Sequence, residues 1–165
     1  MKSVYNFVVK PKGERYNNTK KLDGGELILN TEIFNHQYVN REATVISTPI
    51  IGDTDIKPGD TVIVHHNVFR RWHNVKGIEK NSKAYFNEDT YFINNDQIFL
   101  YKRKDKWIAP KGYCFVIPLK ATDQFNTESE KPLQGIVKYS DGTVEVGDLV
   151  GFRPSSEYEF IVDGE

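Results

Sequence analysis

Cysteine is almost absent from this sequence of 165 residues, because Cys114 is the only one. An intramolecular disulfide framework is therefore excluded, which fits a reducing compartment. Long apolar runs are missing too, since no stretch approaches the roughly 20 apolar residues that a membrane-spanning helix needs. The amino-terminal stretch MKSVYNFVVKPKG has a short apolar run before lysines and a proline, so a signal peptide is not expected.

An excess of charge of either sign is also lacking. Lys and Arg number 22 and Asp and Glu 23, which gives a formal net charge of −1. This balance indicates neither a nucleic-acid partner nor a cationic one. Helical periodicity is absent from every window of about a dozen residues. Aromatic residues make up 13% of the chain, and this composition favours strands over helices.

Short strand signals recur along the chain instead. They are rich in Val, Ile, Tyr and Phe, and turn residues separate them. Regular spacing of this kind predicts an all-β fold, either a barrel or a sandwich. The expected strands are Val4 to Val9, Ala43 to Ser47, Thr61 to Val64, Thr90 to Ile93, Ile98 to Tyr101, Tyr113 to Ile117, Gly135 to Tyr139, Leu149 to Phe152 and Tyr158 to Val162.

Turn chemistry supports this division. Pro58 followed by Gly59 predicts a type II turn, because Pro presets a negative φ and Gly accepts a positive one. The sequence SDGT at 140–143 predicts a tight hairpin. The polar segments 12–24 and 120–132 are expected to be long loops.

Four landmarks occur twice in the same order, which predicts an internal repeat. Tyr-x-Phe-Val-aliphatic begins at Tyr5 and again at Tyr113. A polar loop, a strand and a Gly-Asp turn follow in each case. The strands begin at 43 and 135, and the turns are Gly59-Asp60 and Gly147-Asp148. Residues 101–112 between the copies are expected to be a charged linker or a hairpin.

The landmarks of the first copy resemble those of the co-chaperonin (GroES) family, whose small β-barrel subunits form a ring lid over a chaperonin. A Val-Lys-Pro strand, residues 7–11, leads into a loop with Gly24 and Gly25, and an aliphatic triplet, Leu27, Ile28 and Leu29, follows one residue later. The elements around Ile56, Gly59, Asp60 and Val62, and then DTYFINNDQIFLY, continue the pattern. The resemblance covers residues 4–101 well and 113–165 in part. Glu26 is an additional residue, Ala43 replaces the usual Gly, and 65–87 is longer than the typical connection.

This resemblance implies a GroES-like, partly open β-barrel over residues 1–104, with a mobile loop at 13–30. A linker at 105–112 and a second, incomplete GroES-like β unit at 113–165 follow. The implied chaperonin-binding residues are Gly24, Gly25, Leu27, Ile28 and Leu29. Structural turns are expected at Pro58, Gly59, Asp60, Gly147 and Asp148.

The resemblance also implies the kind of function. The chain would be a co-chaperonin-like subunit that caps a chaperonin ring and assists ATP-dependent protein folding. The ATP belongs to the chaperonin, so no cofactor, metal or enzyme activity is expected of this chain. A homo-oligomeric ring in the cytoplasm is implied. Diverged members of this kind are typical of phages, in which case the compartment is the host cytoplasm.

Several alternatives stay open. In place of a mobile binding loop, residues 26–29 could belong to a buried core strand that continues to Phe34, or to a rigid hairpin. The protein would be a structural component of a phage particle that keeps the barrel without chaperonin binding, and it would then be found in the virion.

Nucleic-acid binding by Arg70, Arg71 and Trp72 is disfavoured by the neutral charge. A metal site at His65, His66 and His73 is disfavoured because adjacent strand residues point to opposite faces. Cys114 is expected to be a buried, inert thiol, and Glu88 and Asp89 to be turn residues.

Overall fold

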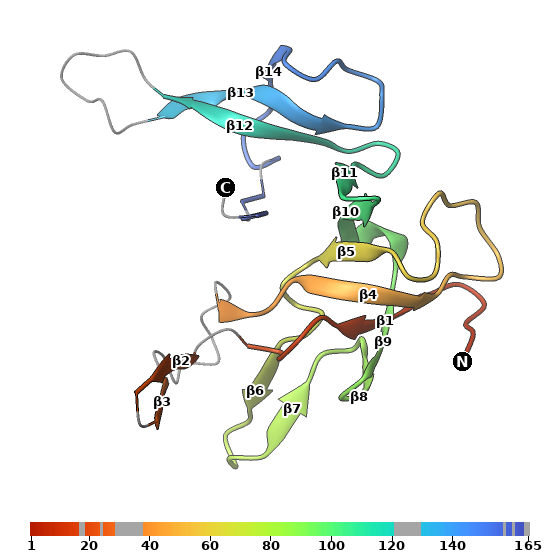
Figure 1. Ribbon diagram of the computed structural model, residues 1–165, viewed down its shortest axis with the longest axis vertical. Helices are drawn as coiled ribbons and strands as arrows, with labels where there is room; N and C mark the ends of the chain where they lie inside the picture. The colour runs from red at the N-terminus through yellow and green to blue at the C-terminus, as the bar shows by residue number, and fades with distance from the viewer. Residues whose placement is uncertain are drawn as a thin grey trace. The chain divides into compact units, whose positions relative to one another are not determined.

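The computed structural model describes residues 1–16, 19–23, 25–28, 38–120, 130–156, 158–159 and 161–163 (Figure 1). The chain divides into two compact units, unit 1 from Met1–Pro110 and unit 2 from Lys111–Glu165. Their boundary falls within residues 105–112, but the linker predicted there contains strand β11, Lys106–Ile108, which forms a hairpin with β10, Ile98–Arg103, as in the other form predicted for 101–112. All regular elements of the described residues are β-strands, apart from the short 3₁₀ turn η2, Asn95–Gln97. The all-β prediction is therefore confirmed.

A seven-stranded antiparallel sheet forms the body of unit 1. Its strands lie in the order β11-β10-β5-β4-β1-β9-β8. The two outer strands are not paired with each other, so the described strands do not close into a barrel. The strand bounds are β1 Phe7–Pro11, β4 Glu42–Ser47, β5 Thr61–Val64, β8 Tyr85–Asn87, β9 Thr90–Ile93, β10 Ile98–Arg103 and β11 Lys106–Ile108.

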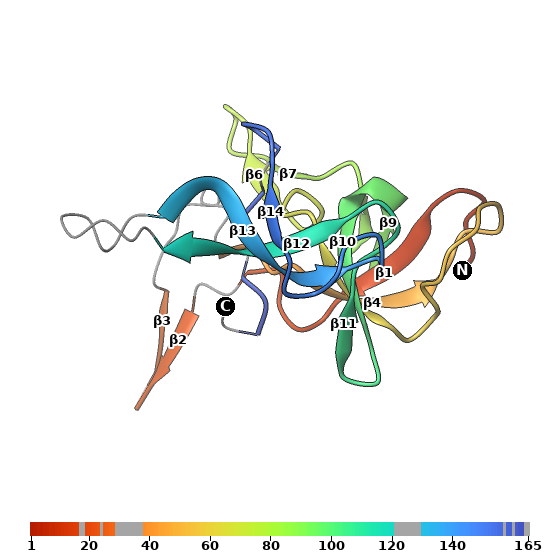
Figure 2. The same cartoon turned by 90° about the horizontal axis from the view of Figure 1, so that it is seen from above.

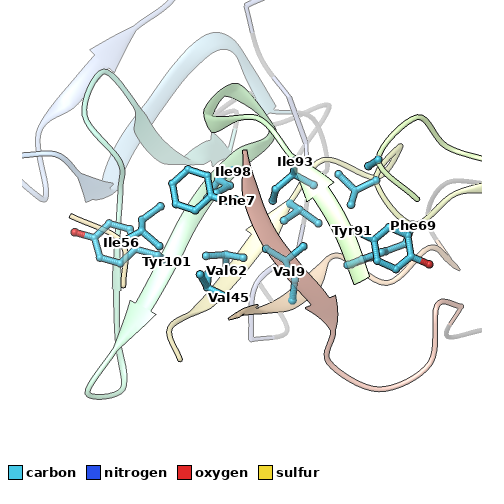
Figure 3. Close-up of a cluster of buried hydrophobic side chains, with 14 of the residues drawn as sticks. Phe7, Val9, Val45, Ile56, Val62, Phe69, Tyr91, Ile93, Ile98 and Tyr101 are labelled. Carbon is cyan, nitrogen blue, oxygen red and sulfur yellow. The ribbon is translucent and has the colours of Figure 1, made fainter. Parts of the chain in front are cut away.

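The core of unit 1 follows from the strand periodicity. Alternate residues of β4 and of β9 are buried, which is the pattern of a strand with one face toward a core. In β5, which lies between β4 and β10, Val62, Ile63 and Val64 are all buried. Figure 3 shows the cluster, in which Phe69 meets Tyr91 edge-on with ring centroids 4.7 Å apart. Labelled members are Phe7, Val9, Val45, Ile56, Val62, Phe69, Tyr91, Ile93, Ile98 and Tyr101.

Two small hairpins accompany this sheet in unit 1. One consists of β2, Thr19–Leu22, and β3, Gly25–Ile28, and the other of β6, Arg71–His73, and β7, Glu79–Asn81. Both are separate two-stranded sheets. The sequence did not predict β2, β6 or β7 as strands, whereas the rigid hairpin kept open as an alternative for residues 26–29 is observed for residues 26–28. In particular, β2 lies inside segment 12–24, which was expected to be a loop.

Unit 2 is built on a three-stranded antiparallel sheet in the order β12-β13-β14 (Figure 2). Its strands are β12, Cys114–Lys120, β13, Glu130–Ser140, and β14, Leu149–Gly151. The strand expected at Tyr158 to Val162 is wrong for the described residues of that range, none of which lies in a strand. The prediction of a tight hairpin at SDGT is also wrong, because eight residues, 141–148, separate β13 from β14.

The predicted repeat is present in the strand register. Pairing of β1 with β4 places Pro11 opposite Ala43, and pairing of β12 with β13 places Pro118 opposite Gly135. A bulge interrupts the first pairing between Val8/Val9 and the second between Phe115/Val116. The register corrects the sequence alignment by one residue, because Val8 rather than Phe7 corresponds to Phe115.

The third strand and the Gly-Asp turn repeat as well. Ala43 lies opposite Val62 in unit 1, and Gly135 lies opposite Val150 in unit 2. The backbone N–H of Gly59 donates to Val45 O and that of Gly147 donates to Val137 O, each at 2.8 Å. Strands β1, β4 and β5 therefore correspond to β12, β13 and β14.

The two units differ in which further strands pair with the edges of this shared three-stranded element. In unit 1, β9 pairs with β1, and β10 pairs with β5. No strand takes either place among the described residues of unit 2. Val9, Val62 and Val64 are accordingly buried, whereas the corresponding Val116, Val150 and Phe152 are half-buried.

Candidate functional site

Two chain segments, 12–16 and 38–42, flank the residues that contain the predicted binding element and are hydrogen-bonded to each other. The backbone N–H of Lys12 donates to Glu42 O, and that of Asn40 donates to Arg15 O, both at 2.9 Å. The side-chain amide of Asn40 donates to the carbonyls of Lys12 and Glu14. We call residues 12–16 and 38–42 the clamp. It fixes the two points between which residues 17–37 extend.

Arg15 anchors the clamp to the body of unit 1. Its side chain is 7% exposed and lies over the rings of Tyr85 and Tyr91, with the guanidinium carbon 5.3 Å and 5.8 Å from their centroids. The guanidinium donates to Phe69 O at 3.2 Å, to Asn81 Oδ1 at 2.7 Å and to Glu88 Oε1 at 3.3 Å. The turn predicted at Glu88 and Asp89 is confirmed.

Tyr16 adds a second anchor. Its hydroxyl donates to Arg71 O at 3.2 Å and accepts from the Arg71 N–H at 2.9 Å, so it satisfies both backbone groups of one residue. Tyr16 also forms a β-bridge with Val39, which lies in the other half of the clamp. Residues 13–16, which the sequence placed in a mobile loop, are therefore held by the clamp.

Strands β2 and β3 form an antiparallel hairpin within the clamped segment. The register pairs Thr19 with Ile28 and Leu22 with Gly25. Of the predicted binding residues, Gly25, Leu27 and Ile28 lie in β3, and the Leu27 side chain is 49% exposed. Gly24 and Leu29 lie outside the described residues. The sequence signal for this hairpin is Asp23-Gly24, a dipeptide favoured in two-residue hairpin turns.

The structural turns adopt the predicted geometry. Gly59 has φ +92°, and the N–H of Asp60 donates to Lys57 O at 3.1 Å, as in a type II turn. Gly147 has φ +100°, and the N–H of Asp148 donates to Glu145 O at 3.2 Å. Each aspartate also closes its turn from the side chain, since Asp60 Oδ2 accepts from Lys57 N at 2.9 Å and Asp148 Oδ2 from Glu145 N at 3.1 Å.

The two aspartates differ in their further partners. Arg103 of β10 donates to Asp60 Oδ2 at 2.6 Å and to Asp60 Oδ1 at 3.3 Å. Burial raises the pKa of Asp60, but the hydrogen bonds from Arg103 and Lys57 and their positive charges outweigh it and lower this pKa. Asp60 is buried, whereas Asp148 is exposed. The counterpart of Arg103 is missing from the described part of unit 2.

No protein-family model, no curated protein and no solved structure matches this chain.

The histidines do not lie as the sequence predicted. His65 and His66 follow β5 in a turn rather than on a strand, and their ring centroids are 4.2 Å apart. The two rings therefore do not point to opposite faces of a strand, as the sequence predicted. His73 lies in β6. Among the described residues, no three His, Cys, Asp or Glu side chains come together as a metal-binding group.

Arg70, Trp72 and Lys83 line an open cleft of unit 1 together with Asn67 and Gln97. The buried Nε of Arg70 has no hydrogen-bond partner there.

The prediction of a buried Cys114 is wrong, because the residue is exposed. It is the first residue of β12, which is an outer strand of the unit 2 sheet. Partial desolvation, and then the charge of Asp141, raise the pKa of the Cys114 thiol, which keeps it protonated at neutral pH. In the described part of the chain, no helix is long and apolar enough to cross a membrane.

Proposed function

We propose that this chain is a co-chaperonin-like subunit that binds a chaperonin ring through the β2–β3 hairpin. The observation that supports this proposal most directly is the hairpin itself. It is a separate two-stranded sheet, it carries a half-exposed leucine, and it lies in the segment 17–37 whose flanking residues the clamp joins by named hydrogen bonds. A clamped hairpin with an apolar strand is suited to docking in an apolar groove of a partner.

The expected binding energy has two opposing parts. Each buried aliphatic side chain gains about 1.5–3 kcal/mol. Leu27, Ile28 and Leu29 together would gain roughly 5–9 kcal/mol, which requires a groove that covers both faces of β3, because successive strand residues point to opposite faces. Ordering a free loop costs about 1–2 kcal/mol for each residue that becomes fixed. Because residues 19–22 and 25–28 are already paired, part of this ordering cost is met before binding. One hairpin then suffices for a measurable contact.

A homo-oligomeric ring would strengthen this contact. Later hairpins of the same ring bind at a high effective concentration once the first has bound, so the ring binds more tightly than one subunit does. The chemistry of ATP hydrolysis would stay with the chaperonin, and this chain would need neither cofactor nor metal. The compartment would be the cytoplasm, or the host cytoplasm for a phage-encoded protein.

The test is co-sedimentation of the purified chain with a bacterial chaperonin in the presence of ATP. We expect the wild-type chain to sediment with the chaperonin, and Leu27→Asp and Ile28→Asp to stay in the supernatant. Val75→Asp is the matched control, because Val75 is fully exposed in the turn between β6 and β7 and lies outside the hairpin. Equal sedimentation of the wild-type chain, Leu27→Asp and Ile28→Asp would contradict the proposal.

A structural role in a phage particle is the second candidate. It is favoured by the open unit 2 sheet, whose outer strands β12 and β14 pair only with β13 among the described residues and so leave one edge each without a neighbouring strand. Such edges are typical places for assembly with other chains. Stoichiometric recovery of the chain from purified particles, with no chaperonin binding, would select this function over the first.

A further inference from the structure

Strand β14 has a neighbouring strand on one side only in the part of unit 2 that the structure describes. The corresponding strand of unit 1, β5, has β4 on one side and β10 on the other. The repeat therefore shows which kind of element fits an edge of this geometry. It is an antiparallel strand with an apolar run that ends in Lys102 and Arg103.

The backbone of β14 presents free positions along this edge. Asp148 O accepts from Val137 N at 2.9 Å, and Phe152 N donates to Leu133 O at 3.0 Å, so both residues are directed toward β13. Since alternate residues of a strand direct their backbone groups to opposite sides, Leu149 and Gly151 direct theirs to the open edge. They correspond to Thr61 and Ile63, which lie opposite Lys102 and Leu100 of β10.

The side chains around the edge are apolar and incompletely covered. Leu149 is 62% exposed, and Val150 and Phe152 are half-buried. In unit 1, the positions of Val150 and Phe152 are taken by Val62 and Val64, which are fully buried in the cluster that contains Ile98 and Tyr101 of β10. A strand with apolar residues at the positions of Ile98 and Tyr101 would cover the unit 2 edge in the same way.

The carboxylate of Asp148 indicates which residue a strand paired with β14 would carry at its end. In unit 1 the arginine at the end of β10 forms an ion pair with the buried aspartate of the Gly-Asp turn, at 2.6 Å between Arg103 Nη2 and Asp60 Oδ2. In unit 2 the same turn carries Asp148, which is exposed, and the hydrogen bond that it accepts comes from Glu145 N of its own turn. The carboxylate is thus placed to receive a cation from a strand at the β14 edge.

We propose that the β14 edge of unit 2 binds an extended strand of a partner protein that carries an apolar run like that of β10, followed by an arginine that pairs with Asp148. The strand would be antiparallel to β14 and bond to the backbone of Leu149 and Gly151. A second copy of this chain is a poor donor, because its own β10 lies between β5 and β11. This proposal goes beyond the proposed function, which depends on the β2–β3 hairpin.

The probe is a synthetic peptide with the sequence of residues 97–104, added to the ¹⁵N-labelled full chain. We expect the amide signals of Leu149 and Gly151 to shift and to gain protection from exchange. Asp148→Asn should weaken binding by roughly tenfold or more, the scale of one charge-assisted hydrogen bond. Asp148→Lys should lose the wild-type peptide and bind the Arg103→Glu peptide instead, which a nonspecific apolar contact would not do.

A second variant separates edge binding from loss of folding. Leu149→Pro removes a backbone donor that faces the open edge and not β13, so the sheet is retained while peptide binding is lost. Absence of peptide binding to the wild-type chain, or equal binding to wild type and Asp148→Lys, would overturn the proposal. Self-association of the chain that Asp148→Lys abolishes would also overturn it, because the occupant would then be a second copy.

Discussion

Asp60 and Asp148 show at the residue scale how one motif acquires two roles. Both follow a glycine of positive φ, and both accept a hydrogen bond from the backbone three residues earlier. Arg103 adds an ion pair to Asp60 alone. The Arg103–Asp60 ion pair therefore joins the Gly59-Asp60 turn to β10 of unit 1, whereas the carboxylate of Asp148 in the Gly147-Asp148 turn is exposed.

Substitution of Asp60 tests this difference through pH. Since the folded state lowers the pKa of Asp60 below its ordinary value of 3.8, the carboxylate stabilises unit 1 above about pH 4, and this contribution is lost as the pH falls through the lowered pKa. Asp60→Asn should reduce the free energy of unfolding at neutral pH by about 1–3 kcal/mol. It should also flatten the acid-induced loss of stability.

Tryptophan fluorescence provides the measurement for Asp60→Asn, because both tryptophans, Trp72 and Trp107, lie in unit 1. Asp148→Asn is the matched control, and it should leave the denaturation midpoint of unit 1 unchanged at every pH. A fluorescence midpoint that responds equally to both substitutions would show that the Asp60–Arg103 pair does not stabilise unit 1.

Gly135 is a second position at which the repeat is informative. Ala43 occupies the corresponding place in unit 1, but a Cβ on Gly135 would lie 2.7 Å from Val116 Cγ2 and 2.9 Å from Ile117 O. Gly135→Ala should therefore destabilise unit 2 by about 1–3 kcal/mol, as overpacking does. Faster hydrogen exchange at the Val137 amide would report the change.

Gly151→Ala is the control for Gly135→Ala. It lies in the same sheet, and the nearest atom to its new Cβ, Leu133 O, would be 3.7 Å away, an ordinary contact. Unchanged exchange at Val137 in both variants would mean that β12 shifts to accommodate the methyl group.

At the element scale, sequence patterns located the strands that have strong local signals. Eight of the nine expected strands overlap observed ones, since runs such as Thr61 to Val64 combine β-branched residues with turn residues on both sides. The exception is Tyr158 to Val162, whose described residues lie outside any strand despite their high strand propensity. Propensity predicts a strand, but only a partner edge makes one.

The strands that the sequence missed have physical reasons in common. Strands β6, β7 and β8 are three residues long, too short for a period of two to be recognised. Strand β2 alternates poorly because Lys20 and Lys21 are adjacent. The clamp could not be predicted at all, since Arg15 meets Phe69, Asn81 and Glu88, which lie 54 to 73 residues away in the chain.

The hairpin register leads to a test by cross-linking. Lys20 lies opposite Leu27, and directly opposed residues of antiparallel strands have Cβ atoms about 4.5–5.5 Å apart. In a Cys114→Ser background, the pair Lys20→Cys and Leu27→Cys should therefore form an intramolecular disulfide on mild oxidation. Loss of free thiols, measured by mass spectrometry after alkylation, would report it.

A neighbouring pair serves as the control for this disulfide. Lys21 and Leu27 are not opposite each other, because Lys21 pairs with Glu26. Lys21→Cys with Leu27→Cys should oxidise at least about tenfold more slowly, since successive side chains of a strand point to opposite faces. Equal oxidation of both pairs would indicate the mobile loop that the family resemblance implies, in place of the hairpin.

At the scale of the whole molecule, the repeat separates a complete unit from a less complete one. The same three strands, bulge and Gly-Asp turn occur twice. In unit 1, β9 and β10 complete the burial of the shared apolar residues, and in unit 2 the described residues leave them half-buried. Because stability scales with buried apolar area, unit 1 should be the more stable of the two.

This difference predicts two unfolding transitions in the full chain. Tryptophan fluorescence reports unit 1 alone, whereas far-ultraviolet circular dichroism reports the strands of both units. We expect the dichroism to begin to change at a lower urea concentration than the fluorescence, because unit 2 unfolds first. Gly135→Ala should move this early phase to still lower urea, and Asp60→Asn should move only the fluorescence transition. Coincident transitions in the wild type and both variants would show instead that the two units unfold as one cooperative body.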